Sequence, residues 1–360
     1  MSGPTSQERP RRRRSFLARF FATLLVLLIL AGLAAGGGAY WAWEKFKAPG
    51  PLAEDAFVMI DQGDGLNAIA NKLREAGVIS RDDPLNLGVL DDATIFKLGA
   101  RYLEQQGKLK AGEYKVPARS SMKQVMELLV SGKVIQYSVT VPEGRTSAMV
   151  LRILNADTVL TGDLRAAPAE GTLLPETYLF TRGTTRADLL RRMERDHKAL
   201  AEKLWANRKA DLPYDTLEEA IILASIVEKE TGVASERPQV ASVFVNRLRK
   251  GMKLQSDPTI IYGLTGGEPL GRGIRKSELE KATPYNTYVI DGLPPTPICN
   301  PGRASLEAVI NPPDTDYLFF VADGTGGHAF AATLAEHEAN VRKWREIEAQ
   351  RAKDQQEATP

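Results

Sequence analysis

The sequence predicts an α+β protein with a single N-terminal transmembrane helix, and three observations lead to this fold class. Residues 20–43 carry no charged side chain. Short strand patterns alternate with helical patterns through the rest of the chain. Eight successive small or apolar residues, 220–227, indicate a helix buried on all sides. Together they predict an anchored protein of two or three compact units, as expected for 360 residues.

The composition of the chain excludes several classes of protein. Apolar residues make up 43% and charged residues 26%, ordinary values that exclude a disordered chain, a collagen-like fibre and a multi-span membrane protein. The formal net charge of +2 is too small for a dedicated nucleic-acid binder. One cysteine, Cys299, and three histidines are too few for Cys- or His-based metal centres. We therefore expect no metal ion and no other cofactor.

The uncharged segment 20–43 is the predicted transmembrane helix. A helix of this length measures about 36 Å, enough to cross a hydrocarbon core of about 30 Å. Tyr40, Trp41 and Trp43 suit the membrane–water interface, and the arginines at 11–14 lie on the other side. The positive-inside rule then places a basic tail, residues 1–19, in the cytoplasm. We expect a single-pass protein of the plasma (inner) membrane, with the remaining chain extracytoplasmic or periplasmic.

A cleaved signal peptide is the alternative interpretation of this segment. Small residues at 34–39 would suit a signal peptidase. The length of the span and the aromatic residues at its end favour an uncleaved anchor.

Three strand-to-helix units follow the anchor, at residues 57–77, 114–132 and 139–154. The same nine-residue offset separates a strand position from a helix position in each: Ile60 and Ile69, Val116 and Val125, Val141 and Val150. Gly77 and Gly132 lie where the first two helices should end. Units this short are typical of small modules that stack or pair.

The first two units, residues 55–137, resemble the LysM-like region that precedes the catalytic part of some cell-wall enzymes. The resemblance implies a small β-α module that binds polymers of N-acetylglucosamine. A spacer between the membrane and the following domain is the alternative, because the turns carry no aromatic platform for sugar stacking.

A turn-rich segment, residues 170–180, and a long helix over 186–208 come next. Glu176 is a candidate for a substrate-lining acid, although a capping or surface position explains it better. His197 stands among Arg195, Asp196 and Lys198, which predicts an exposed histidine.

The helix predicted over 217–232 carries the clearest chemical signal. Glu230 continues the apolar stripe of Leu223, Ile226 and Val227, whereas Glu228 lies about 200° round the helix. A carboxyl at the edge of a core loses hydration, which raises its pKa and keeps a proton available near neutral pH. A general acid acting on a glycosidic oxygen needs this property. From this helix alone, two exposed glutamates remain the favoured alternative.

Longer motifs reverse that preference. Residues 224–263 resemble the YceG-like family, the endolytic murein transglycosylases, and further matches follow in family order at 283–288, 292–295, 300–302, 317–321 and 326–330. The resemblance covers about 140–345 and implies a mixed α+β catalytic domain over 138–345, before a charged tail at 346–360. It implies a lyase that cuts the MurNAc–GlcNAc bond within peptidoglycan strands and leaves 1,6-anhydro ends. It also implies that Glu230, the second glutamate of Glu-Lys-Glu-Thr, is the catalytic acid.

Seven other motif residues are candidates for substrate binding. They are Glu228, Asn246, Gln255, Asp257, Tyr285, Asn286 and Thr287. Amides, hydroxyls and carboxylates suit sugar hydroxyls and N-acetyl groups, but capping and turn formation explain several of them nearly as well. We expect Gln255 and Asp257 on an extended stretch, and Asn246 on a helix capped near Ser235. For His328, a structural role is favoured over orientation of the substrate.

One carboxyl is enough for the implied reaction. If the 6-hydroxyl of the sugar attacks, the same glutamate first donates a proton and then accepts one. A muramidase-type hydrolase remains open, because Glu228 or Asp257 would provide a second acid. A non-catalytic peptidoglycan-binding scaffold is the alternative from another class. Expected partners are peptidoglycan glycan strands, with membrane-bound peptidoglycan synthases as further candidates, in the release or termination of nascent strands.

Overall fold

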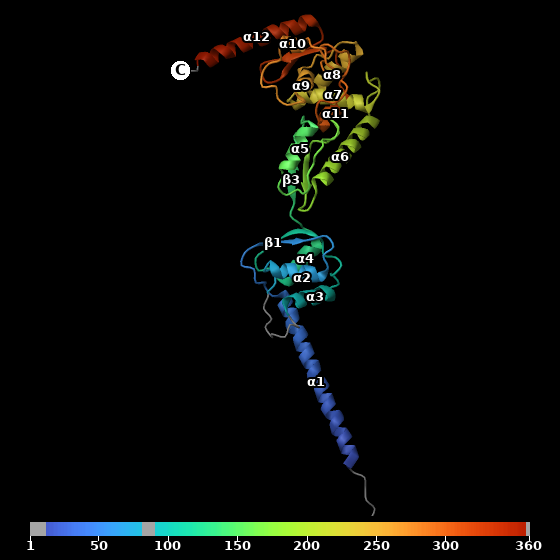
Figure 1. Cartoon of the computed structure of the whole chain (residues 1–360), viewed down its shortest axis with the longest axis vertical. Helices are drawn as coiled ribbons and strands as arrows, with labels where there is room; N and C mark the ends of the chain where they lie inside the picture. Colours follow the sequence, from blue (N-terminus) through green and yellow to red (C-terminus); the bar gives the residue numbers. More distant parts are fainter. Residues whose placement is uncertain (1–11, 81–90, 358–360) are drawn as a thin grey trace, which may run out of the picture. The chain divides into compact units, whose positions relative to one another are not determined.

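A computed structural model describes residues 12–80 and 91–357 of the chain (Figure 1). It is a mixed α+β structure, as predicted, and it divides into two compact units, residues 1–135 and 136–360. Most of the predicted basic tail, including Arg9 and Arg11, lies outside the described residues.

The first unit contains the N-terminal helix and a small two-stranded sheet with three further helices. Its elements are α1 (Arg12–Lys47), β1 (Ala56–Ile60), α2 (Leu66–Glu75), α3 (Asp92–Tyr102), β2 (Gly112–Val116) and α4 (Met122–Ser131). Residues 17–47 of α1 are long and apolar enough to cross a membrane. The strands and helices expected in the first two strand-to-helix units are confirmed, whereas α3 has no counterpart among the expected elements.

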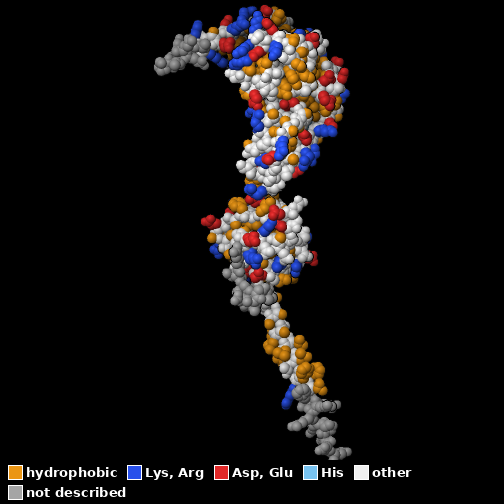
Figure 2. All heavy atoms as spheres, viewed as in Figure 1, with side chains coloured by type: hydrophobic (Ala, Val, Ile, Leu, Met, Phe, Trp, Pro, Cys, Tyr) orange, Lys and Arg blue, Asp and Glu red, His pale blue; other side chains and the backbone are white. Residues whose placement is uncertain are grey.

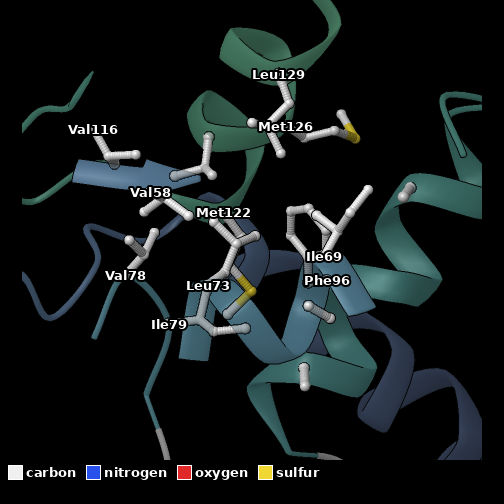
Figure 3. Close-up of a cluster of buried hydrophobic side chains, with 14 of the residues drawn as sticks. Val58, Ile69, Leu73, Val78, Ile79, Phe96, Val116, Met122, Met126 and Leu129 are labelled. Carbon is white, nitrogen blue, oxygen red and sulfur yellow. The ribbon is translucent and has the colours of Figure 1, made fainter. Parts of the chain in front are cut away.

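Both strand-to-helix units share one hydrophobic core. β1 and β2 pair antiparallel, with Val58 opposite Tyr114. Side chains from α2, α3 and α4 cover them, and Figure 3 shows Leu73, Phe96 and Leu129 within this cluster. A capping box between Ser121 and Gln124 begins α4. The region is therefore one module and not two stacked ones.

The last turn of α1 belongs to this core. Phe46 is 1% exposed, and its ring stacks on Trp43 with centroids 5.8 Å apart. α3 passes this ring at Gly99, where an added Cβ would lie only 2.5 Å from a ring carbon of Phe46. The helix that is long and apolar enough to cross a membrane thus continues, without a break, into a folded module.

The second unit begins with an antiparallel pair of strands and two helices. β3 (Tyr137–Thr140) pairs with β4 (Thr177–Phe180), and α5 (Ser147–Ala156) and α6 (Arg186–Ala206) contribute to the same core. The third strand-to-helix unit and the long helix are confirmed. His197 is not the exposed residue that its charged neighbours predict, because it is only 4% exposed. It follows Leu189 and Met193 at helical spacing, so it faces inward while its neighbours in sequence face solvent.

A helical core and a terminal hairpin complete the second unit. Its elements are α7 (Leu217–Glu230), η1 (Ala234–Glu236), α8 (Arg237–Arg249), α9 (Asp257–Thr265), α10 (Lys276–Leu279), α11 (Arg303–Ile310), β5 (Phe319–Ala322), β6 (His328–Ala331) and α12 (Leu334–Glu357). α7 packs against α8 and α11, which bury its middle turns as predicted. The charged segment from residue 346 continues α12 as far as Glu357.

Asn300 connects three separate segments of this unit. Its Nδ2 donates hydrogen bonds to Arg145 O at 3.0 Å and to Ser147 Oγ and Glu170 Oε1 at 3.2 Å. Its Oδ1 accepts a hydrogen bond from Leu173 N at 2.9 Å. The side chain is fully buried, so its hydrogen bonds hold the start of α5 and the turn at 169–173 beside the loop before α11.

Candidate active site

Glu230 is the last residue of α7, at the boundary between core and solvent. Ile226 and Val227, which precede it on the helix, are fully buried, whereas Glu230 is partly exposed. Thr231 takes an extended conformation, so the helix ends directly after the carboxylate. The helix therefore brings an acid from the core to the surface.

Burial changes the protonation of this acid. Desolvation raises the pKa of Glu230 from 4.5 to about 7, and the negative charge of Asp257 acts in the same direction. A hydrogen bond from Ser256 and the positive charges of His328 and Arg247 act in the opposite direction. A substantial fraction of Glu230 is therefore protonated at neutral pH, and the group can both donate and accept a proton.

Ser256 is the hydrogen-bond partner of Glu230, its Oγ donating to Glu230 Oε1. The serine precedes α9 and is fully buried. Its backbone N–H donates to Thr287 Oγ1 at 2.9 Å, and its carbonyl accepts from Thr259 Oγ1 at 2.6 Å. Thr287 therefore fixes the segment that carries Ser256, and it is too deeply buried to meet a sugar.

Gln255 and Asp257 flank Ser256, and both are exposed. Of the two, Asp257 interacts electrostatically with Glu230. The expected extended stretch is wrong for both residues, because Gln255 has a left-handed backbone with φ of 52° and Asp257 begins α9. For Asp257 the reason is Pro258, whose fixed φ and missing N–H suit the first turn of a helix. Tyr288 Oη donates to Asp257 Oδ1 at 2.7 Å and so adds a tyrosine to the site.

Two further groups interact electrostatically with Glu230. Arg247 is held by its guanidinium, which donates to Leu318 O at 2.7 Å and Leu254 O at 2.8 Å. His328 is held by Glu236, whose Oε2 lies 2.7 Å from His328 Nδ1 and whose Oε1 accepts from His328 N. A proton on Nδ1 would make the imidazole a donor to that carboxylate.

Glu228 is engaged within the protein. Its Oε2 accepts hydrogen bonds from Ser305 Oγ at 2.7 Å and Gly302 N at 3.0 Å, and Arg237 lies 3.4 Å from Oε1. The side chain is 5% exposed. This arrangement joins the end of α7 to the start of α11, a role that differs from the expected sugar contact.

Two asparagines on the candidate list also bind the backbone. Asn246 Nδ2 donates to Thr315 O at 2.7 Å and Tyr317 O at 3.1 Å. The buried Asn286 donates to the backbone carbonyls of Glu278, Leu279 and Lys281 and accepts from Tyr288 N at 3.0 Å. Both side chains organise the loops that surround the site.

Tyr285 is partly exposed, with its Oη 2.7 Å from Thr296 Oγ1 and its ring centroid 5.0 Å from that of Tyr262.

Glu176 accepts a hydrogen bond from Thr177 N at the start of β4. Cys299 is buried, and burial raises the pKa of its thiol. Within residues 12–80 and 91–357, no group of three or more His, Cys, Asp or Glu side chains is arranged to hold a metal ion.

Sequence reasoning named Glu230, Gln255 and Asp257 as candidates but did not name Ser256, Arg247 or Tyr288, which the structure adds to the surroundings of Glu230. Ser256 and Tyr288 lie inside motifs already singled out, between Gln255 and Asp257 and directly after Thr287. Arg247 follows Asn246. Their position next to candidate residues in the motifs was the one feature of the sequence that could have identified them. Their interactions around Glu230 depend on how α7, α8 and α9 pack.

The chain is similar to known proteins over most of its length. Residues 58–343 match the model of the YceG-like family. A Bacillus subtilis (strain 168) protein named endolytic murein transglycosylase is 38% identical over 178 residues, which are 49% of this chain and 48% of that protein. A Streptococcus pneumoniae (strain D39) protein of the same name is 28% identical over 385 residues, 91% of this chain and 65% of that one. The chain thus spans between about half and two thirds of the length of these relatives.

A crystal structure of a yceG-like protein from Listeria monocytogenes is among the solved structures that match. Its sequence is 27% identical, and the match covers 79% of this chain and 98% of that one with a TM-score of 0.47.

Proposed function

Because the chain belongs to the YceG-like family, we propose that it is a membrane-anchored endolytic lytic transglycosylase that cuts peptidoglycan glycan strands. The relatives reported above carry the name of this activity. The observation that carries the proposal is the Glu230 carboxyl, placed at the edge of the core with its pKa raised to about 7. A single desolvated acid of this kind meets the chemical requirement of the reaction.

Glu230 acts twice in the proposed mechanism. It first gives its proton to the oxygen of the MurNAc–GlcNAc bond, and the C1–O bond breaks as C1 acquires oxocarbenium character. The 6-hydroxyl oxygen of the same MurNAc then bonds to C1, and its proton passes to Glu230. The acid is restored, no water is consumed, and the product ends in 1,6-anhydro-MurNAc.

Ser256 supports both steps of this mechanism. Its hydroxyl donates a hydrogen bond to Oε1 of Glu230. The other oxygen, Oε2, therefore carries the proton that Glu230 gives to the glycosidic oxygen. When Glu230 is ionised, the same hydrogen bond stabilises the carboxylate. The exposed Gln255 and Asp257 and the partly exposed Tyr285 are the proposed sugar-contacting groups.

We assign the parts of the chain as follows. Residues 20–43 anchor the protein in the plasma membrane, with the tail 1–19 in the cytoplasm. Residues 55–137 form a LysM-like module that binds glycan. Residues 138–345 form the domain that cleaves the strand, and a charged tail occupies 346–360. The arginines before the span and the tyrosine and tryptophans after it support this orientation. Proposed partners are glycan strands and, in the membrane, peptidoglycan synthases whose nascent strands the enzyme would release or terminate.

A muramidase-type hydrolase is the second candidate, favoured by the exposed Asp257 beside Glu230. Digestion of purified glycan strands followed by mass spectrometry separates the two reactions. Lytic cleavage gives anhydro ends, whereas hydrolysis gives reducing ends that are heavier by one water. Absence of cleavage by the wild-type protein, with retained strand binding, would overturn both in favour of a scaffold.

The docking role of the module requires a separate test. A variant lacking residues 55–137 should cleave soluble strands but bind intact wall material less well than the full chain. Equal binding by both proteins would reduce the module to a spacer.

A further inference from the structure

An apolar groove of about 610 Å³ lies between α1 and α3 in the first unit. Its walls are formed by Ala39, Tyr40 and Trp43 of α1 and by Leu98 and Tyr102 of α3, together with buried neighbours. Tyr102 meets Trp43 edge-on, with ring centroids 5.6 Å apart. The groove is therefore continuous with the helix that we propose to span the membrane.

α3 presents unusually exposed apolar surface beside this groove. Leu98 is 47% exposed and Tyr102 is 77% exposed, and their i,i+4 spacing puts them on one face. Tyr40, at the end of the predicted span, is 68% exposed. The opposite face of α3, with Phe96 and Ala100, is fully buried in the module. α3 thus has one apolar face in the core and another facing outward.

The position of α3 along α1 determines how deep the outward face of α3 would lie in a membrane that α1 crosses. Phe46 is buried in the module core and packs against Gly99, so α3 lies directly against the end of α1. The rise from Tyr40 to Phe46 is about 9 Å, and the headgroup layer on each side of a bilayer is about 5–7 Å thick. α3 lies beside residues 39–46 of α1, so a membrane span that ends near Trp43 would put α3 at the level of this layer.

The chemistry of the surface matches this depth. Tyrosine and tryptophan are the residues that favour the membrane interface. Two exposed basic side chains accompany them. Lys47 Nζ lies 5.5 Å from the Trp43 ring and 2.8 Å from Glu44 Oε1, its partner in an exposed ion pair. Arg101 stands between Leu98 and Tyr102 in the sequence and suits lipid phosphates.

We propose that lipid covers this groove, with α3 lying in the headgroup layer and Leu98 and Tyr102 in contact with the bilayer. The module is then seated on the membrane, and the β1–β2 sheet faces away from it. Figure 1 shows α3 at the end of the module that α1 enters, and β1 at the opposite end. This inference rests on the proposed anchoring by α1.

The test places a fluorescent probe at each end of the module. Tyr102→Cys and, as a matched control, Lys115→Cys on β2 are labelled with an environment-sensitive maleimide in the full-length chain. The native Cys299 is fully buried, and labelled wild type measures its background. Each protein is reconstituted into phosphatidylcholine–phosphatidylglycerol vesicles that contain brominated lipids, and quenching is compared with vesicles lacking bromine.

We expect quenching at position 102 to exceed that at 115 several-fold, with a blue-shifted emission at 102. If quenching is equal at both positions in a protein that floats with the vesicles, the contact of α3 with lipid is wrong but the membrane anchoring by α1 still holds. If the protein does not float with the vesicles, both the anchoring by α1 and the contact of α3 with lipid are wrong. Efficient disulfide formation between two copies through unlabelled Tyr102→Cys, without lipid quenching, would instead assign the groove to a second copy of the chain.

Discussion

Ser256 Oγ donates a hydrogen bond to Glu230 Oε1, which joins the residue before α9 to the last residue of α7. The bond lowers the pKa of a carboxyl that burial raises, so the two effects oppose each other at one group. Glu230 is thereby held with a pKa near neutrality, where a single group is effective both as acid and as base.

Replacing Glu230 tests its proposed role directly. Glu230→Gln keeps the size of the side chain but has no proton to give to the leaving oxygen, so cleavage should fall by at least about two orders of magnitude. Release of anhydro ends from purified strands measures the loss. Glu218→Gln, an exposed position in the first turn of the same helix, should keep wild-type turnover. Similar activity of all three proteins would exclude Glu230 as the acid.

The dependence of activity on pH should report the same group. Glu230 must enter the reaction protonated, so kcat/KM should decline as pH rises through about 7. Ser256→Ala removes the hydrogen bond that lowers this pKa, and the decline should move to higher pH. The comparison requires kcat/KM profiles of both proteins between pH 5 and 9. An unmoved alkaline limb in Ser256→Ala would show that another group controls it.

Glu228 should matter for stability more than for chemistry. Glu228→Gln weakens the pair with Arg237 and presents an amide to Gly302 N–H, which should cost about 1–3 kcal/mol of unfolding free energy. The folded variant should retain most of its cleavage activity. Thermal unfolding and turnover per folded molecule measure the two effects, and a stable but inactive variant would place Glu228 in the reaction.

His197 should make the protein sensitive to acid. Burial lowers the pKa of His197 from 6.5 to about 4, so the folded state disfavours the proton that the unfolded state accepts. Its contribution to stability is present above pH 6.5 and is lost as pH falls toward 4. His197→Leu should therefore lose less stability than wild type between these values. Denaturant unfolding at a series of pH values measures the difference, and parallel curves would contradict the expectation.

The elements that sequence predicted well are those whose pattern is local. The apolar stripe and capping residues of α7, and the strand-to-helix patterns of the first module, depend on residues a few positions apart. His197 was mispredicted because its sequence neighbours are charged, although helical spacing places them on other faces. Ser256 and Arg247 could not be assigned, because their relation to Glu230 arises only when α7, α8 and α9 pack together.

Asn300 has a consequence for the lifetime of the protein. Asparagines deamidate when the following backbone nitrogen attacks the side-chain amide, and the resulting aspartate would here place a negative charge near Glu170 Oε1, which lies 3.2 Å from Asn300 Nδ2. The following residue is Pro301, whose nitrogen bears no hydrogen and cannot complete that cyclisation. The side chain that joins these three segments is therefore protected against deamidation by this route.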